Sequence, residues 1–339
     1  MTLTTLLIRI FIAAIVLTGI SVAVFDQKKN IFVSFLQNYC GALFVFSGWV
    51  KAIDPLGTAY KMEQYFAEFE STFQETWMSF LAPLFPWLSN LSISFSVVMI
   101  IFEIVLGLML IFGIKNKFTS WAFLLLVGFF TFLTGFTYLT GYVPEGTNFF
   151  SFGSWGEYEE SNMKVTDCGC FGDFIKLKPY TSFLKDVALL IPAFIFLFKS
   201  KDMHTWFSSK TNSAITIGST ALLALYCFSN YVWDLPHSDF RPFKEGVNVR
   251  EQKAAEEDAL TNAPMTYILT NKSTQDVTEL PYEEFMKQYK SYPKEQFDYD
   301  TRTGEPAIPH TKISEFMVCL LYTSPSPRDQ RGSRMPSSA

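Results

Sequence analysis

The stretch of sequence that decides the fold lies at residues 93–114 and reads ISFSVVMIIFEIVLGLMLIFGI. Glu103 is the one charged residue within it. The hydrocarbon core of a bilayer is about 30 Å thick, and a helix needs about 20 apolar residues to cross it. We therefore predict that this stretch is a transmembrane helix.

Five other stretches have the same character. Four of them carry no charge, and the fifth, at residues 179–198, is more polar because it contains Lys185 and Asp186. They comprise residues 10–25, 31–50, 118–143, 179–198 and 211–233. The core helices of a soluble protein would not give so many apolar runs of this length. The sequence thus predicts an all-α polytopic membrane protein with six transmembrane helices.

The composition agrees with a membrane protein and indicates which kinds of partner to expect. Of the 339 residues, 49% are hydrophobic and 17% are charged, against about 25% charged residues in a typical soluble domain. The net charge of −5 leaves no basic surplus to neutralise phosphates. We therefore expect the lipid bilayer as a partner and no nucleic acid.

The charges of the loops predict an orientation. Lys and Arg concentrate in cytoplasmic loops, and here the basic residues fall in alternate loops, at Lys28, Lys29, Lys115, Lys117, Lys201 and Lys210. The long loops at 51–75 and 144–179 are acidic. This pattern places both termini and the acidic loops outside. Cleavage of the first helix as a signal peptide would reverse that pattern, so we favour a retained helix.

The segment between the second and third helices has an amphipathic pattern. Its apolar residues recur at helical spacing, at Met62, Tyr65, Phe66, Phe69, Phe73 and Trp77. Such a pattern predicts a helix lying on the outer membrane surface. We interpret it as a cap of the bundle in preference to a substrate lid.

The predicted organisation has five parts. Residues 1–30 form an extra N-terminal helix and loop, 31–200 the main membrane domain, and 201–234 the sixth helix. Residues 235–316 form a small external α+β segment, expected to be incomplete as a domain, with helices at 248–260 and 281–289 and strands at 265–270 and 276–280. Two isolated histidines of this part, His237 and His310, suggest no site.

Residues 317–339 differ from everything before them. They are rich in Ser, Pro and Arg and have no periodic pattern. The pattern is that of a disordered tail, and it also resembles translated adapter sequence at the end of assembled sequencing reads. We favour the second interpretation, under which Cys319 has no function.

The cysteines divide into two kinds. Cys40 and Cys227 lie within predicted membrane helices, where a free cysteine usually acts as a small hydrophobe. Cys168 and Cys170 lie in an external loop, within the sequence DCGCFGD. A disulfide across one residue would close a strained ring and would be easy to reduce. Three interpretations stay open for this pair: a redox-active pair, a site for a soft metal ion such as Cu(I), and a structural role.

Glu103 is the other candidate, because a carboxyl group inside the membrane is costly and is a functional hypothesis by default. It could be protonated, could pair with Lys185, or could relay protons to a quinone, and a structural contact between helices is an equal alternative. We expect Lys51, Asp54, Lys185 and Asp186 to lie at external membrane edges, where snorkelling and interfacial pairing explain them.

Two motifs carry a family resemblance. The sequence FSGWVKAIDPLGTAYK at 46–61 resembles the start of DoxX-family membrane proteins. The glycine-spaced helix from Glu103 to Gly113, followed by CGCFG at 168–172, resembles the MauE branch, the methylamine utilisation membrane proteins. The longer layout, with its C-terminal region, resembles DoxX-like proteins of Bacteroidetes-type bacteria.

The resemblance implies a four-helix bundle formed by the second to fifth helices, and a redox-associated role. It implies Cys168 and Cys170 as the redox pair and Glu103 as the family-type acid, which are our candidate catalytic residues. It also implies a bacterial inner-membrane protein with the Cys loop and the C-terminal segment in the periplasm. A membrane quinone is the candidate cofactor, and a periplasmic thiol–disulfide or electron-transfer protein is the candidate partner.

The functional prediction is therefore thiol–disulfide exchange through the Cys168 and Cys170 pair, coupled to a quinone or to a periplasmic partner. Whether the chain is itself an enzyme, as part of a thiol–disulfide or quinone oxidoreductase, stays open. The alternatives are a non-catalytic membrane scaffold or assembly factor, and soft-metal handling by the two cysteines.

Overall fold

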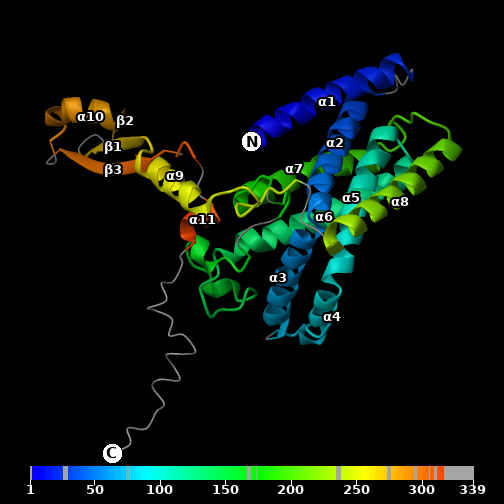
Figure 1. Ribbon diagram of the computed structural model, residues 1–339, viewed down its shortest axis with the longest axis horizontal. Helices are drawn as coiled ribbons and strands as arrows, with labels where there is room; N and C mark the ends of the chain where they lie inside the picture. The colour runs from blue at the N-terminus through cyan, green and yellow to red at the C-terminus, as the bar shows by residue number, and fades with distance from the viewer. Residues whose placement is uncertain are drawn as a thin grey trace, which may run out of the picture. The chain divides into compact units, whose positions relative to one another are not determined.

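The chain forms two compact units, Met1–Asp239 and Phe240–Ala339 (Figure 1). The computed structural model describes residues 2–25, 30–74, 76–165, 169–172, 174–233, 238–272, 276–293, 296–304, 306–308 and 311–316. Cys168, His237, His310 and the tail at 317–339 lie outside these described residues.

The first unit confirms the prediction of a polytopic helical membrane protein. Its described residues contain six helices that are long and apolar enough to cross a bilayer. They are α1 (Leu3–Ala23), α2 (Ile31–Ile53), α5 (Ser92–Phe112), α6 (Asn116–Thr140), α7 (Pro179–Phe198) and α8 (Ser209–Trp233). Ile8, Ile12 and Val16 of α1 and Leu222 and Leu225 of α8 are exposed. In a bilayer such side chains contact lipid, which supports a membrane environment.

Helices α2 and α5 pack against each other at glycines. A Cβ atom added at Gly107 would lie 2.8 Å from the carbonyl oxygen of Gly41, and one added at Gly48 would lie 2.5 Å from Ile104 Cγ1. Small residues let two membrane helices approach this closely, and the approach stabilises the pair through van der Waals contact. These glycines therefore set the register between α2 and α5.

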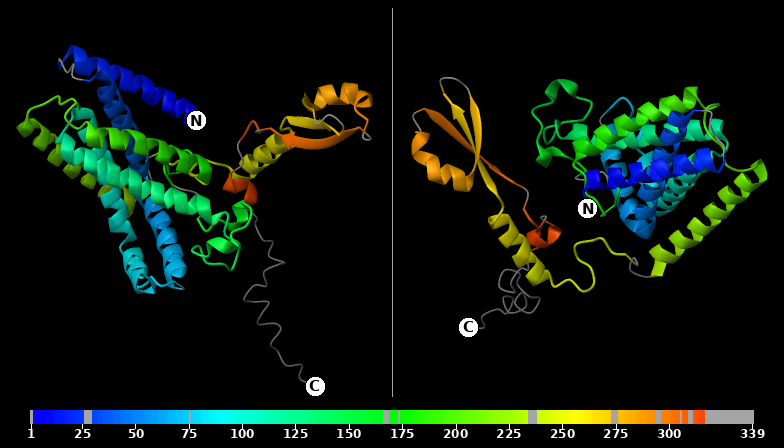
Figure 2. Two further views of the ribbon diagram at one scale, coloured as in Figure 1. Left: turned by 180° about the vertical axis from the view of Figure 1, so that it is seen from behind. Right: turned by 90° about the horizontal axis from the view of Figure 1, so that it is seen from above.

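The rest of the bundle forms around this pair. Helices α6 and α7 lie side by side (Figure 2) and α6 brings Phe123, which is fully buried, against Phe44 of α2 and Phe196 of α7. Helix α1 packs on α2, where Asn38 Nδ2 donates to Thr18 Oγ1 at 3.1 Å. Helix α8 packs on α5. Cys40 and Cys227 are completely buried among apolar side chains, as expected for small hydrophobes.

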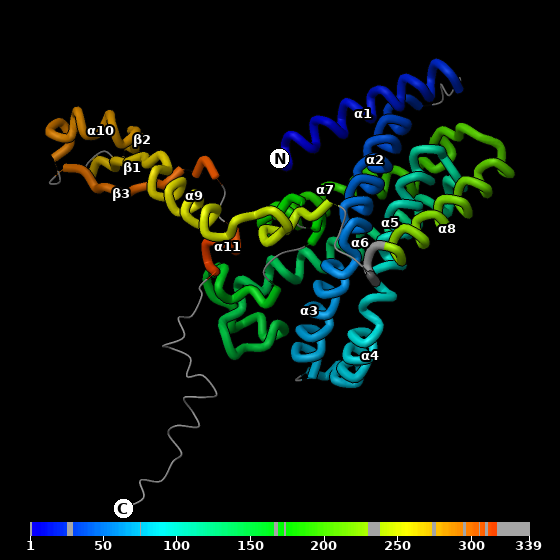
Figure 3. The backbone as a smooth tube through the Cα atoms, viewed as in Figure 1, coloured from blue at the N-terminus to red at the C-terminus, as the bar shows by residue number. Residues whose placement is uncertain are grey.

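Helix α3 (Pro55–Gln74) follows α2 after a break at Asp54, and α4 (Leu84–Asn90) leads into α5 (Figure 3). The apolar side of α3 packs on α6, which agrees with the interpretation of this segment as a cap of the bundle. Phe69 packs on Phe136 of α6 at a ring distance of 4.9 Å, and Tyr65 Oη is 2.7 Å from Thr137 Oγ1. The aromatic residues of α3 thus extend the protein core. Three short 3₁₀ turns lie in the loops of this unit, at Ser79–Leu81, Phe152–Ser154 and Glu160–Asn162.

The second unit is a small α+β structure. It contains α9 (Val249–Thr261), β1 (Met265–Asn271), β2 (Val277–Pro281), α10 (Tyr282–Gln288), the 3₁₀ turn Tyr289–Ser291, β3 (Phe297–Thr303) and α11 (Lys312–Glu315). The sheet is antiparallel with the order β2-β1-β3. Phe285 of α10 stacks on Tyr267 of β1 at 4.2 Å and also contacts Tyr299 of β3.

The buried carboxylate of Glu256 joins α9 to α11, the first and last helices described in this unit. Glu256 of α9 accepts hydrogen bonds from the backbone N–H of Thr311 at 3.0 Å and from the hydroxyl groups of Thr311 and Ser314. Burial alone would raise the pKa of Glu256, but these hydrogen bonds and one from Gln252 outweigh it and lower the pKa to about 2. The carboxylate therefore stays ionised and holds α11 against α9.

Candidate functional site

The two glycines of the CGCFG motif shape a tight turn in the loop between α6 and α7. Gly169 has a φ of +59° and Gly172 a φ of +52°, a conformation that residues with a Cβ atom rarely adopt. The N–H of Gly172 donates to the carbonyl oxygen of Gly169 at 3.2 Å. The turn places Cys170 and Phe171 between two left-handed residues.

This turn is anchored to α2. Ser47 Oγ donates to the carbonyl oxygen of Cys170 at 2.9 Å, and the buried ring of Phe171 lies 6.4 Å from that of Phe46. Phe174 also contacts Phe46, at 5.6 Å. The backbone of Cys170 is thus fixed at the end of the bundle by one hydrogen bond and a small aromatic cluster.

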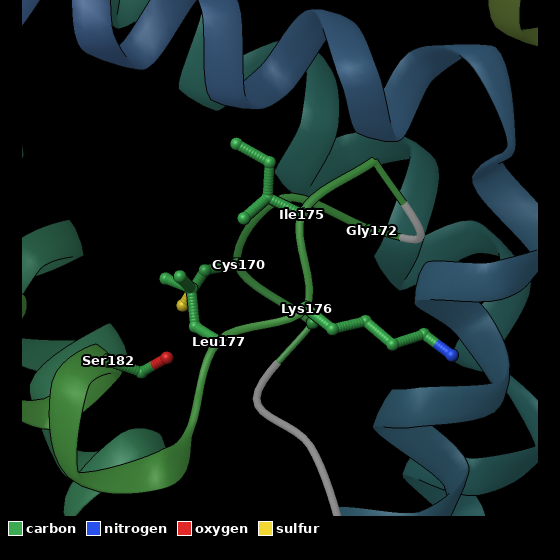
Figure 4. A pocket seen from close by; sticks show the side chains of 7 residues that line it. Cys170, Gly172, Ile175, Lys176, Leu177 and Ser182 are labelled. Carbon is green, nitrogen blue, oxygen red and sulfur yellow. The ribbon is translucent and has the colours of Figure 1, made fainter. Parts of the chain in front are cut away.

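A small pocket opens at Cys170 (Figure 4). Its lining residues are Gly169, Cys170, Gly172, Ile175, Lys176, Leu177 and Ser182. The Cys170 side chain is half-buried and its thiol forms no disulfide with a described cysteine. Ser182, at the start of α7, is completely buried, and its hydroxyl has no hydrogen-bond partner among the described residues. A buried hydroxyl without a partner is uncommon, so the pocket has an unused polar group beside the thiol.

Glu103 pairs with Lys51 and not with Lys185, which was one of the alternatives. Lys51 Nζ lies 2.7 Å from Glu103 Oε2, and the two residues are 7% and 2% exposed. The cause is the register of α2 and α5, because Gly48 lies one turn before Lys51 and contacts Ile104, the neighbour of Glu103. The ammonium group of Lys51 also lies 4.8 Å from the centre of the Phe130 ring.

A second ion pair joins Lys185 to its sequence neighbour Asp186. Asp186 is 1% exposed and also accepts a hydrogen bond from Thr134 Oγ1 of α6 at 3.0 Å. Lys185 Nζ lies 5.8 Å from the centre of the Phe171 ring, next to Cys170 in the turn. Lys51, Lys185 and Asp186 are therefore paired, as one part of the expectation had it, but Lys51 and Asp186 are buried and do not snorkel.

Asp54 has a different role from these buried residues. Its carboxylate accepts a hydrogen bond from the N–H of Gly57 at 3.1 Å, in the first turn of α3. A carboxylate there satisfies one of the unpaired N–H groups at a helix start. Asp54 thus caps α3 and lies outside the charged cluster.

The charges around Cys170 act on its thiol in opposite directions. Burial has the largest effect and raises the pKa of the Cys170 thiol above its ordinary value. Lys185 lowers this pKa, Asp186 raises it, and Lys51 and the Ser182 hydroxyl lower it. The site therefore combines one accessible sulfur atom with two lysine cations that favour its thiolate form.

A second buried polar group, which the sequence did not reveal, lies at the opposite end of the bundle. His204, in the connection between α7 and α8, is 1% exposed, and its Nε2 lies 2.8 Å from the carbonyl oxygen of Ile111. Gln37 of α2 accepts from the N–H of His204 at 3.1 Å and donates to the carbonyl oxygen of Leu110 at 2.7 Å. Burial lowers the pKa of His204, although its bond to Ile111 raises it.

A glycine permits this contact at the end of α5. A Cβ atom at Gly113, where φ is +66°, would lie 1.8 Å from the carbonyl oxygen of His204. In the sequence, the signal for this contact was Gly113, because a glycine at the end of a helix marks a close approach or a left-handed residue. His204 therefore belongs to a clamp that joins the connection between α7 and α8 to the ends of α2 and α5.

The described residues near Cys170 form no site that matches a metal ion or a quinone. Among the described residues, no group of three or more His, Cys, Asp or Glu side chains is placed to hold a metal ion. The pocket at Cys170 has a cavity volume of about 10 Å³, whereas small-molecule sites usually have about 300–1,000 Å³. A quinone head group with its lipid tail does not fit this pocket.

The fold and the site define a polytopic helical membrane protein in which a glycine-shaped loop holds a thiol above two buried ion pairs. Residues 29–145 match the family described as Methylamine utilisation protein MauE. This match confirms the resemblance to MauE-like membrane proteins over these residues. The match includes Lys51 and Glu103 and ends before Cys170. No curated protein and no solved structure matches the chain.

Proposed function

We propose that this protein is a membrane thiol–disulfide exchange protein whose reactive pair is Cys168 and Cys170. The observation that carries the proposal is the position of Cys170, which is accessible from a pocket and lies beside the cations of Lys185 and Lys51. Reactive cysteines are partly exposed and have cations nearby that favour the thiolate, whereas structural cysteines are buried and inert. Cys40 and Cys227 of the same chain have the inert kind of surroundings.

The exchange is a two-electron reaction between two pairs of sulfur atoms. A thiolate of Cys170 attacks one sulfur of a partner's disulfide, forms a mixed disulfide and releases the partner's other sulfur as a thiolate. The thiolate of Cys168 then attacks the sulfur of Cys170 and releases the partner's second thiolate. The partner gains two electrons and, after protonation, two thiols, while Cys168 and Cys170 become a disulfide. The reverse sequence oxidises a partner dithiol.

We assign the partner to the periplasm of a bacterium and the chain to the inner membrane. The acidic loop that carries the cysteines and the basic loops on the other side support this orientation. Disulfides form and persist in the periplasm, whereas cytosolic thiols are kept reduced. We derive no step through a quinone, because the pocket does not fit one. In this proposal Glu103 is the partner that holds Lys51 in place, and it takes no proton from a substrate.

The test is the redox state of the cysteine pair in intact membranes. Mass-shift alkylation across a graded series of thiol–disulfide buffers should show a reversible two-electron transition, which Cys168→Ser or Cys170→Ser abolishes. The matched controls are Cys40→Ser and Cys227→Ser, which should leave the transition unchanged. Cysteines that stay reduced at every potential, or a disulfide that resists mild reductant, would refute the proposal in favour of a scaffold role. Metal that co-purifies in proportion to the two intact cysteines would favour metal handling.

A further inference from the structure

The start of α7 presents three polar groups toward the turn that contains Cys170. Ser182 lines the pocket together with Cys170, and Figure 4 shows its hydroxyl on the side of the thiol. Lys185 lies one turn further along α7, and its ammonium group is over the ring of Phe171, the residue after Cys170. Asp186 follows and pairs with Lys185. One helical turn thus carries a hydroxyl, a cation and a carboxylate that all influence the Cys170 thiol.

We propose that Lys185 and Ser182 are positioning residues that set the reactivity of Cys170. In this arrangement Lys185 stabilises the thiolate, and Ser182 donates a hydrogen bond to the sulfur atom that carries negative charge during exchange. The inference deepens the proposed function and depends on it for its biological purpose. Its physical content, the ionisation of Cys170, can be measured without any exchange partner.

The ammonium group of Lys185 can interact with two anions, the Asp186 carboxylate and the Cys170 thiolate. An ammonium group has three N–H donors, and one of them is engaged by the carboxylate of Asp186. Asp186 is fixed from α6 by Thr134, so the pair cannot turn away from the site together. Lys185 therefore stays paired in both protonation states of Cys170 and can stabilise the negative charge on the sulfur when the thiol ionises.

The buried hydroxyl supports the same conclusion independently. Ser182 is completely buried without a hydrogen-bond partner among the described residues, and leaving a buried polar group unpaired costs about 1–3 kcal/mol. A structural serine at this position would be replaced by alanine without loss. A serine that bonds a transient thiolate or a mixed disulfide has a reason to remain unpaired in the resting protein.

Other charged groups around the turn do not replace Lys185. Lys51 of α2 is engaged by Glu103 of α5. Lys61 of α3 approaches Gly169 with the carbon atoms of its side chain, and its ammonium group donates to Gln64 Oε1 at 3.0 Å. Lys176 lies in the turn's own segment and is exposed to solvent, where screening weakens its effect. Of the described cations, Lys185 has the largest influence on the Cys170 thiol.

The experiment measures the rate of alkylation of Cys170 against pH in the full chain, with Cys168→Ser so that no loop disulfide forms. Alkylation is assigned to Cys170 by peptide mass spectrometry. Lys185→Gln should slow alkylation about tenfold at pH 7, the effect of a change of one unit in a thiol pKa, and the rates should converge at high pH. Ser182→Ala should slow it about threefold. Lys178→Gln, an exposed lysine four residues before Ser182, is the matched control and should change nothing.

The outcomes separate this inference from the proposed function. Equal pH profiles for Lys185→Gln and Lys178→Gln would overturn the inference, even if the cysteine pair cycles. A profile that depends on Lys185 in a chain whose cysteines never cycle would keep the inference and remove the proposed function. If Lys185→Gln does not fold because Asp186 is left unpaired, the double variant Lys185→Gln with Asp186→Asn removes both charges. Because Asp186 acts on the thiol pKa in the opposite direction to Lys185, the double variant is compared with Asp186→Asn alone, and equal profiles for these two variants would also overturn the inference.

Discussion

The two ends of the membrane bundle each hold buried polar groups, but they use them differently. At the His204 end, side chains of α2 and the connection between α7 and α8 bond to backbone groups, and a glycine permits direct contact. At the Cys170 end, charged side chains bond to each other, and the buried hydroxyl of Ser182 has no described partner. The first arrangement is that of a structural clamp. The second retains costly charges beside a pocket, which is typical of a functional site, whereas buried polar atoms without a described partner occur at both ends, at Ser182 Oγ and at His204 Nδ1.

The largest difference between the two ends should appear when a buried charge loses its partner. Removing one member of a buried ion pair usually costs about 3–5 kcal/mol, whereas replacing both with apolar residues is often neutral. We therefore expect Lys51→Met to destabilise the protein strongly and the double variant Lys51→Met with Glu103→Leu to recover most of the loss. Thermal unfolding in detergent measures both variants.

The double variant also tests whether the Lys51 and Glu103 pair has a function. If stability recovers while the redox transition of the cysteine loop changes, the pair is retained for the site. A double variant that is as unstable as the single variant would instead show that the ion pair itself stabilises the bundle. The comparison between a charged functional end and a neutral structural end would then fail.

The His204 end should give an intermediate effect that depends on pH. Burial holds the pKa of His204 below its ordinary value of about 6.5, so the unfolded chain binds a proton in a pH range where the folded protein does not. Stability should therefore be complete above about pH 7 and should fall as the pH decreases below 6.5, by up to about 1.4 kcal/mol per pH unit. His204→Gln should reduce this dependence, as measured by unfolding at pH 8 and pH 5.5. An equal loss in both proteins would contradict the assignment.

The same comparison explains what the sequence could and could not predict. The six membrane helices were predictable because about 20 apolar residues in succession have few other uses. The Lys51 and Glu103 pair was not predictable, because it depends on which glycines of α2 and α5 meet. His204 lies in the polar stretch KDMHTW, which has the composition of an exposed loop, and its burial arises from contacts with distant helix ends.

The sheet of the C-terminal unit shows the same limit of prediction from sequence. The helix and the two strands near residues 248–280 were predicted from their patterns, but β3 was not. Along β3, the aromatic residues Phe297 and Tyr299 alternate with Asp298, Asp300 and Arg302, so the charged face hid the strand. Only the pairing of β3 with β1 makes this alternation meaningful, with Tyr299 opposite Leu269.

The smallest predicted effect is a difference in stability between two serine variants, one at each end of the bundle. Ser21 of α1 and Ser182 of α7 are both completely buried. Ser21 Oγ accepts a hydrogen bond from Trp206 Nε1 at 2.8 Å, near the His204 end, whereas Ser182 has no described partner. Ser21→Ala should cost about 1 kcal/mol or more, because it leaves the indole N–H unpaired, whereas Ser182→Ala should be neutral or slightly stabilising. Unfolding of the two variants side by side measures this difference. A cost at Ser182 equal to that at Ser21 would mean that the Ser182 hydroxyl stabilises the fold, and it would then no longer support a role of Ser182 at the thiol.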